Sequence, residues 1–165
     1  MADDSAKDSI QDPPAAPVPP RKVRPRIELG WAELVDVEAL GLIGIRAKID
    51  TGARTSALHA TDIEPYSENG EARVRFRSET GPEAEHIWCS APLVEQRCVT
   101  SSNGVEEIRY IIDVRIRLAG ISVPVQLSLT DRTPMAFPML VGRTALKRHF
   151  IVNVARKYQH GAPDN

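Results

Sequence analysis

The sequence has only two cysteines, no long apolar run and almost no net charge, and each shortage excludes a class of protein. Cys89 and Cys98 cannot form a disulfide scaffold, and they fit a reduced interior at least as well as one disulfide. No apolar segment is long enough to span a bilayer, and the acidic, polar start resembles neither a signal peptide nor a transit peptide. The formal net charge of -1 gives no whole-protein field that attracts nucleic acid or an acidic membrane. We therefore expect a cytoplasmic protein with no direct nucleic-acid or membrane partner.

The sequence does contain enough apolar material for one folded domain behind a proline-rich tail. Its 165 residues are 42% hydrophobic and 26% charged, as in a globular chain with a single core. Residues 11–26 are rich in proline and basic residues and offer little to bury, and such stretches are more often linkers than ligands of proline-binding modules. We predict a disordered tail over residues 1–26 and a folded domain over residues 27–165.

The hydrophobic pattern of the domain predicts β-strands joined by tight turns. Residues 71–79 alternate apolar with charged side chains, as in a half-exposed strand. Asn69-Gly70 and Ala119-Gly120 are placed to close two antiparallel hairpins. Pro124 indicates an edge or a bulge in the second hairpin, because proline cannot donate a ladder hydrogen bond.

A single short helix is predicted late in the chain, over residues 142–150, with a final strand over residues 150–154. The rest of the domain is expected to be strand and turn. The sequence therefore predicts a mainly β fold, a small closed or sandwiched barrel with one short C-terminal helix. Trp31 and Trp88 are expected in its core.

The motif Asp50-Thr51-Gly52-Ala53 follows an apolar strand and is the first candidate for chemistry. Alone, it is also consistent with a turn that ends a strand. The segment PMLVGRTAL, residues 138–146, supplies an apolar pair, a glycine and the predicted helix. Together the two segments resemble the retropepsin-like aspartic proteases, in which the catalytic Asp-Thr/Ser-Gly loop is backed by such a strand and helix. The resemblance implies a retropepsin-like closed β barrel.

Three longer segments, residues 47–60, 127–146 and 150–161, narrow this resemblance. They are similar, in the same order, to a bacterial family labelled ATP-dependent zinc protease, the RimB-like aspartic proteases. That family is related to an ATP-grasp glutamate ligase that adds a tail to a ribosomal protein. The resemblance implies peptide-bond hydrolysis in glutamate-rich or glutamate-tailed substrates, and a functional link to such a ligase.

The chemistry of amide hydrolysis without a covalent intermediate requires a second carboxyl group. One carboxylate takes a proton from water while a protonated partner polarises the carbonyl, and two close carboxyls share one proton because both cannot ionise cheaply. Asp50 is the only aspartate followed by Thr-Gly or Ser-Gly, so we predict a homodimer that pairs two Asp50 side chains across a two-fold axis. Gly52 then allows the tight turn and donates its N–H to the carboxylate, while the Thr51 hydroxyl braces the paired loops.

Basic residues around the motif distinguish it from the apolar pocket of a general retropepsin. Lys48 lies on the same strand face as Asp50 and Arg54 follows the loop, so both can keep carboxylates ionised and stabilise anionic substrate groups. Guanidinium groups also suit bidentate capture of a glutamate side chain, but Arg109 and Arg132 can equally be solvated or structural charges, because exposed arginines are common on strands. We expect acidic peptide substrates and activity nearer neutral pH than in an acid protease. The predicted substrate-binding residues are Lys48, Arg54, Thr55, Ser56, His59, Arg109 and Arg132.

Zinc and ATP, the two cofactors in the family label, find little support in the sequence. There is no HExxH segment, and the best metal candidate by spacing is His86, Cys89 and Cys98, for which no fourth ligand is evident. There is also no phosphate-binding GxxxxGK[ST] loop. We predict neither a metal nor a cofactor. Two other functions stay open: a dimeric module that binds acidic tails without cutting them, and a zinc-dependent protease.

Three local assignments complete the sequence-based predictions. Arg143, at the start of the predicted helix, is expected to be structural. His59 is a substrate contact or simply a residue on a strand. The loops over residues 78–86 and 100–107 are both long, polar and glycine-bearing, so either can cover the cleft as a flap.

Overall fold

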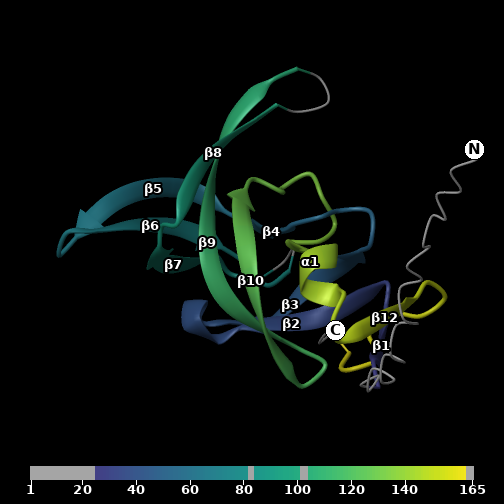
Figure 1. The fold of residues 1–165 in the computed structure, drawn as a ribbon. Helices are drawn as coiled ribbons and strands as arrows, with labels where there is room; N and C mark the ends of the chain where they lie inside the picture. The colour runs from purple at the N-terminus through teal and green to yellow at the C-terminus, as the bar shows by residue number, and fades with distance from the viewer. Residues whose placement is uncertain (1–24, 82–83, 101–103, 163–165) are drawn as a thin grey trace, which may run out of the picture.

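The structure, a computed structural model, describes residues 25–81, 84–100 and 104–162 and is mainly β (Figure 1). Residues 1–24 of the predicted tail lie outside these ranges, and the first strand begins at Ile27. The elements are β1 Ile27–Gly30, β2 Ala32–Val37, the 3-10 turn Glu38–Leu40, β3 Leu42–Asp50, β4 Ser56–His59, β5 Thr61–Glu68, β6 Glu71–Ser78, β7 Ile87–Pro92, β8 Glu95–Thr100, β9 Glu106–Leu118, β10 Ile121–Thr130, β11 Met139–Gly142, α1 Arg143–Leu146 and β12 Phe150–Asn153.

Within the described ranges, six strands close into a barrel in the order β10-β4-β11-β3-β2-β9, and the pairing of β9 with β10 completes the ring. The core contains apolar side chains from every wall, including Leu42, Ile45, Leu58, Leu127 and Met139, each with 0% exposure. Burial of these side chains is the main stabilising contribution, at roughly 1.5–3 kcal/mol for each fully buried side chain of this size. The predicted closed barrel is confirmed.

The order of the strands places two distant segments beside the end of β3. β11 pairs with β3 in parallel, and its last residue, Gly142, is in register with Asp50. The other edge of β11 pairs antiparallel with β4, the strand that follows the Asp50 loop. The loop therefore connects β3 to β4 beside the start of α1.

Both predicted hairpins form, and their turn residues adopt the left-handed backbone that such turns require. Asn69 and Gly70 have φ of 51° and 81° between β5 and β6, and Ala119 and Gly120 have φ of 49° and 75° between β9 and β10. Pro124 pairs with Arg115 of β9. On its other side β4 pairs only with residues 127–130 of β10, so the position of Pro124 is a local edge, as predicted.

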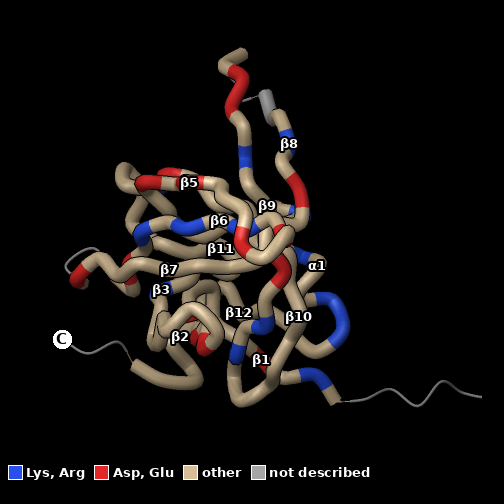
Figure 2. Tube along the Cα trace, turned by 90° about the vertical axis from the view of Figure 1, so that its left-hand side faces the viewer, with Lys and Arg blue, Asp and Glu red and all other residues tan. Residues whose placement is uncertain are grey.

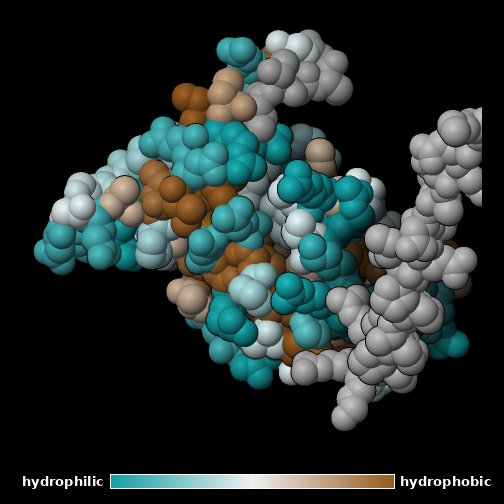
Figure 3. All heavy atoms as spheres, viewed as in Figure 1, coloured by the Kyte–Doolittle hydropathy of each residue, from teal (hydrophilic) through white to brown (hydrophobic). Residues whose placement is uncertain are grey.

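Two features lie outside the barrel wall. A three-stranded sheet, β5-β6-β7, projects to one side, and the hairpin of β8 and β9 extends beyond the barrel (Figure 1). This hairpin carries both acidic and basic segments (Figure 2). The face seen in Figure 3 is mainly hydrophilic, with smaller apolar patches.

The two ends of the domain meet at a separate small sheet. β1 pairs in parallel with β12, from Ile27 opposite Phe150 to Gly30 opposite Asn153. The chain then turns back, and the His160 Nε2 atom lies 2.8 Å from the carbonyl oxygen of Glu28. The buried Glu33 carboxylate accepts the backbone N–H groups of residues 30, 159 and 160, which fixes the C-terminal segment against β1 and β2.

The structure corrects two predictions about individual elements. The helix α1 has only four residues rather than nine, because the chain reaches Phe150 as a strand that pairs with β1. Trp31 and Trp88 are 37% and 59% exposed, so neither is a core residue. Trp88 instead lies on β7, where the Arg75 guanidinium is 5.8 Å from its ring centroid. No helix in the described ranges has both the length and the apolar character needed to cross a membrane.

Candidate active site

Asp50 is the last residue of β3, and the loop after it holds its carboxylate in place. Oδ1 accepts the backbone N–H of Gly52 at 2.9 Å and that of Ala53 at 3.1 Å. Hydrogen bonds from backbone N–H groups favour the ionised form and fix the orientation of the carboxyl group. The bond predicted between Gly52 and Asp50 is confirmed. The Thr51 side of the loop is exposed at the protein surface.

Two glycines make this close arrangement possible. A Cβ atom on Gly142 would lie 2.4 Å from the carbonyl oxygen of Thr55, a distance that real Cβ atoms do not adopt. A Cβ atom on Gly52 would lie 3.2 Å from Oδ1 of Asp50. β11 and the Asp50 loop can therefore approach only because Gly142 has no side chain.

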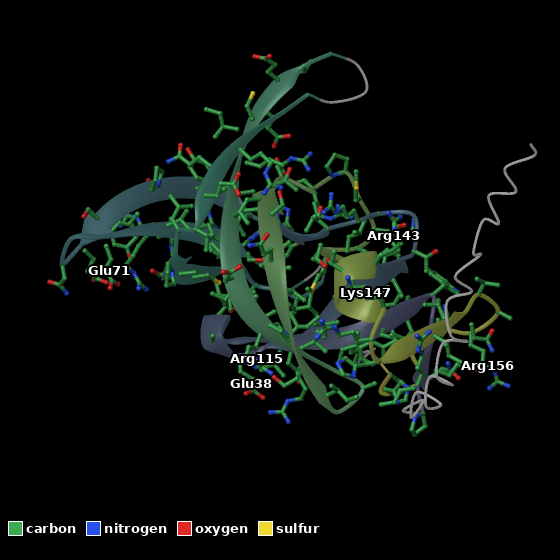
Figure 4. The ribbon with its side chains drawn as sticks, in the orientation of Figure 1. Glu38, Glu71, Arg115, Arg143, Lys147 and Arg156 are labelled. Carbon is green, nitrogen blue, oxygen red and sulfur yellow. The ribbon has the colours of Figure 1, made fainter. Side chains whose placement is uncertain are left out.

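Arg143, the first residue of α1, ties the loop to the helix (Figure 4). Its Nη1 donates to the carbonyl oxygens of Thr51 at 3.0 Å and Gly52 at 2.8 Å. Its backbone N–H donates to the carbonyl oxygen of Ala53 at 2.9 Å. The structural role predicted for Arg143 is confirmed, and its partners are the backbone of the motif itself.

The predicted cations differ in how they are placed around the loop. Lys48 and Arg54 are exposed, on the strand before the motif and directly after it. Arg132 is only 9% exposed, and its Nε donates to the carbonyl oxygen of Phe137 at 3.1 Å. It is therefore not a solvated surface charge, and its bond to Phe137 agrees with the structural role that was the other alternative, so its contact with a substrate stays a prediction.

The electrostatics of Arg132 show which charges are its neighbours. Burial lowers the pKa of its guanidinium from the usual value, and the positive charge of Arg109 lowers that pKa further. The carboxylate of Asp50 acts in the opposite direction and raises it. The charges of Asp50 and Arg109, which are far apart in sequence, therefore both act on Arg132.

Two adjoining cavities connect the loop to β8, β9 and β10. A groove of about 650 Å³ is lined by Arg54, Thr55, Arg97, Pro124, Val125, Gln126 and Thr144. A smaller pocket of about 60 Å³ is lined by Thr55, Arg97, Arg109, Ile111, Gln126 and Ser128. The structure thus brings Arg54, Thr55 and Arg109 together and adds Arg97, which the sequence-based prediction missed.

Ser56 and His59, also predicted to bind substrate, are buried behind the loop. Ser56 Oγ accepts the backbone N–H of Gly142 at 3.1 Å. His59 is 2% exposed, and its Nδ1 accepts the backbone N–H of Arg132 at 2.9 Å. Both side chains hold other site segments in position, and their contact with a substrate stays a prediction.

The candidate metal ligands His86, Cys89 and Cys98, on which no metal was predicted, are not brought together. Cys89 lies on β7 and is buried, with Sγ 3.5 Å from the carbonyl oxygen of Leu40, whereas Cys98 is exposed on β8 in a different sheet. Burial raises the pKa of the Cys89 thiol to about 11, which opposes the thiolate form that binds metals. The spacing in sequence does not bring the three residues together, because β7 and β8 belong to different sheets.

A different group, His59, Glu79 and His86, has potential ligand atoms within 4.8 Å of one another. His59 Nδ1 already accepts the N–H of Arg132, so in a neutral ring the proton is on Nε2. A ligating nitrogen needs a free lone pair, and neither nitrogen of His59 then offers one. These residues do not fit the zinc of the family label without loss of the bond to Arg132.

The fold and the loop together define a class of protein: a retropepsin-like β barrel in which an Asp-Thr-Gly loop is backed by a glycine strand end and a short helix. Residues 28–163 match the family model RimB-like, described as retropepsin-like aspartic endopeptidase RimB. The chain belongs to this family.

Curated relatives carry a different name. Proteins of Shewanella pealeana and Shewanella halifaxensis, both called "Probable alpha-L-glutamate ligase", are 36% identical over 132 residues, and one of Parasynechococcus marenigrum with the same name is 33% identical over 138 residues. The matches cover 79%, 79% and 82% of this chain. The chain spans only 29–30% of the length of these relatives.

A crystal structure shares the fold. It is that of Lpg0085, a DUF785 protein of unknown function from Legionella pneumophila. The TM-score is 0.66 at 24% sequence identity, over 81% of this chain and 97% of that one. At this identity the similarity supports the architecture alone.

Proposed function

We propose that the protein is an aspartic-type endopeptidase whose catalytic dyad forms from Asp50 of two chains. The observation that carries the proposal is the geometry of the Asp50 loop in a member of a family named for such endopeptidases. Two backbone N–H groups hold Oδ1, while Oδ2 accepts no hydrogen bond from the described residues. Oδ2 is then the oxygen that exchanges a proton with the attacking water.

The homodimer follows from the chemistry of the reaction. Peptide hydrolysis by this route needs two carboxyl groups, one ionised and one protonated, that share a proton at short distance. The chain offers one Asp-Thr-Gly loop, so a second copy supplies the other. Exposure of Thr51 and Gly52 leaves that side of the loop accessible to a partner.

Acidic peptides, glutamate-rich or glutamate-tailed, are the proposed substrates. Lys48, Arg54, Arg109 and Arg132 supply positive charge around the loop and the adjoining groove, and this charge favours binding of carboxylates. The relatives named for glutamate ligation contain a segment similar to this chain. That shared segment supports a functional link between this domain and an enzyme that adds glutamate.

Mass spectrometry of an oligoglutamate-tailed peptide tests the proposal. The peptide is incubated near neutral pH with chelator-washed wild-type protein, with Asp50→Asn and with Asp113→Asn, which removes an exposed carboxylate on β9 as a matched control. We expect shortened peptides from wild type and Asp113→Asn only. Cleavage by Asp50→Asn would refute the aspartic mechanism.

The same experiment separates the two other functions. Activity that is lost on chelation and restored by stoichiometric zinc would replace the proposal with a zinc-dependent protease. Binding of the peptide without cleavage by any of the three proteins would indicate a dimeric binding module for acidic tails.

A further inference from the structure

The strands β8 and β9 place two arginines directly opposite each other. Arg97 and Arg109 are paired in the antiparallel register. Side chains that are paired in this way lie on the same face, with Cβ atoms about 4.5–5.5 Å apart, and two like charges so placed destabilise the sheet. Both arginines line the 60 Å³ pocket beside Thr55. This arrangement is costly unless an anion lies between or beside them.

In the structure each arginine is compensated by a glutamate two residues before it. Arg97 donates to both carboxylate oxygens of Glu95, from Nη2 at 2.8 Å and from Nε at 3.2 Å. The pair is 44–46% exposed, so an outside carboxylate can reach it and compete. Arg109 makes only longer contacts to Glu107, at 3.4 Å from both Nε and Nη2.

Ser128 also lines this pocket, and its hydroxyl is buried. Ser128 is 8% exposed, and among the described residues nothing forms a hydrogen bond with its Oγ. A buried hydroxyl without a partner is unfavourable, so such groups usually bind water or a ligand. Ser128 is in register with Ile111 of β9, which in turn is in register with Glu95 of β8. The unpaired hydroxyl and the two guanidinium groups therefore lie on the same face.

We propose that Arg97, Arg109 and Ser128 form a subsite for one side-chain carboxylate of an acidic peptide, and that Glu95 binds the Arg97 guanidinium when no peptide is bound. The inference rests on the proposed function for its substrate class. The pocket, at about 60 Å³, is the size of a carboxylate with a few water molecules and not of a whole residue. Guanidinium groups bind carboxylates through two parallel hydrogen bonds, and Glu95 already binds Arg97 in this way.

Binding measurements on the Asp50→Asn protein test the subsite without interference from cleavage. The probe is a fluorescein-labelled tetraglutamate with an amidated C-terminus, compared by fluorescence anisotropy with the matching tetraglutamine at fixed ionic strength. Arg97→Gln is expected to weaken tetraglutamate binding by about 10-fold or more and to leave tetraglutamine binding unchanged. Ser128→Ala is expected to weaken it by about 3-fold. Arg115→Gln, on β9 outside the pocket, is the control for loss of an exposed arginine (Figure 4).

Glu95→Gln gives a test in the opposite direction, which a misfolded variant cannot imitate. Removal of the internal competitor is expected to tighten tetraglutamate binding by about 3-fold or more. Glu106→Gln makes the same charge change on the opposite face of the hairpin and is expected to change binding by less than about 2-fold. Equal tightening by the two variants would show a general charge effect and would overturn the role of Glu95.

Two further outcomes overturn the subsite itself. Equal weakening of both peptides by Arg97→Gln would mean a structural role for that arginine. Tetraglutamine with a free C-terminus that binds as tightly as amidated tetraglutamate, and depends equally on Arg97, would assign the pocket to a main-chain carboxylate.

The inference and the proposed function can fail separately. Selective binding of tetraglutamate without hydrolysis by the wild-type protein would remove the protease and keep the subsite. Hydrolysis that depends on Asp50, with a glutamate preference that Arg97→Gln leaves unchanged, would support the protease and overturn the subsite.

Discussion

At the scale of single residues, Arg143 has more influence on the candidate site than its exposed position indicates. Its guanidinium holds two successive carbonyl groups of the loop that orients the Asp50 carboxylate. Within the described residues, its side-chain hydrogen bonds go to the loop backbone and not to the Asp50 carboxylate, so we regard it as a positioning residue. Small displacements of a reacting group have large effects on rate, because catalysis depends on orientation.

We predict that Arg143→Gln lowers kcat for the oligoglutamate peptide by about 10–100-fold and changes KM little. Arg143→Lys, which keeps one donor group near the carbonyls, should recover part of the loss. Lys147→Gln, at the other end of α1, is the control and should retain full activity (Figure 4). Steady-state kinetics distinguish this positioning role of Arg143 from a role in substrate binding, for which KM would rise at constant kcat.

The residues that sequence reasoning found and missed differ in their local signals. Asp50 to Ala53 form a contiguous motif, so they could be predicted without any knowledge of pairing. Arg97 lies in a strand whose charged and polar residues occur on both faces. The sequence of this strand therefore has no hydrophobic alternation that would single out Arg97 as a site residue. Only the register of β8 with β9 reveals that it opposes Arg109. The lack of a hydrogen-bond partner for the Ser128 hydroxyl likewise results from tertiary packing, which cannot be predicted from the neighbouring sequence.

At the scale of elements, the contact between β11 and the Asp50 loop is the tightest approach near the site. Gly142 is in register with Asp50, and its Cα faces the carbonyl of Thr55. A methyl group on residue 142 would push β11 away from the Asp50 loop, although strand pairing and the hydrogen bonds from α1 keep these two segments together.

We therefore predict that Gly142→Ala reduces the free energy of unfolding by on the order of 1–3 kcal/mol, through overpacking. Gly81→Ala is the matched control, because its Cβ would lie 3.4 Å from a side-chain atom, Cδ of Arg46, and not against backbone, so the substitution should cost less than about 1 kcal/mol. Urea denaturation followed by circular dichroism measures both. Equal stability of the two variants would show that β11 and the loop can separate at little cost.

Elements were predictable where their signals are local. The two hairpins follow from turn residues that accept a left-handed backbone, and both form where they were predicted. The length of α1 did not follow from propensity, because tertiary pairing of β12 with β1 ends it early. The exposed Trp88 was missed because its stacking on Arg75 requires the β6–β7 register.

At the scale of the whole molecule, the central prediction is that activity belongs to a pair of chains. If the dyad is shared, an excess of Asp50→Asn protein draws wild-type chains into mixed dimers that have only one normal aspartate. We predict that wild-type activity falls progressively as Asp50→Asn protein is added, and that specific activity falls on dilution as dimers dissociate. Addition of Asp113→Asn protein should cause no such loss. Sedimentation velocity supplies the oligomeric state, and a fully active monomer would contradict the shared dyad.

The small sheet of β1 and β12 has a consequence for how such a domain is combined with others. Because β1 and the segment after β12 are held together, and the His160 Nε2 atom lies 2.8 Å from the carbonyl oxygen of Glu28, the chain enters and leaves the barrel at neighbouring points. A domain whose ends are adjacent can be joined to, or placed within, a longer polypeptide without strain on its interior. The barrel is therefore suited to be one domain of a longer protein. This agrees with its similarity to 29% of the length of a protein named as a probable glutamate ligase.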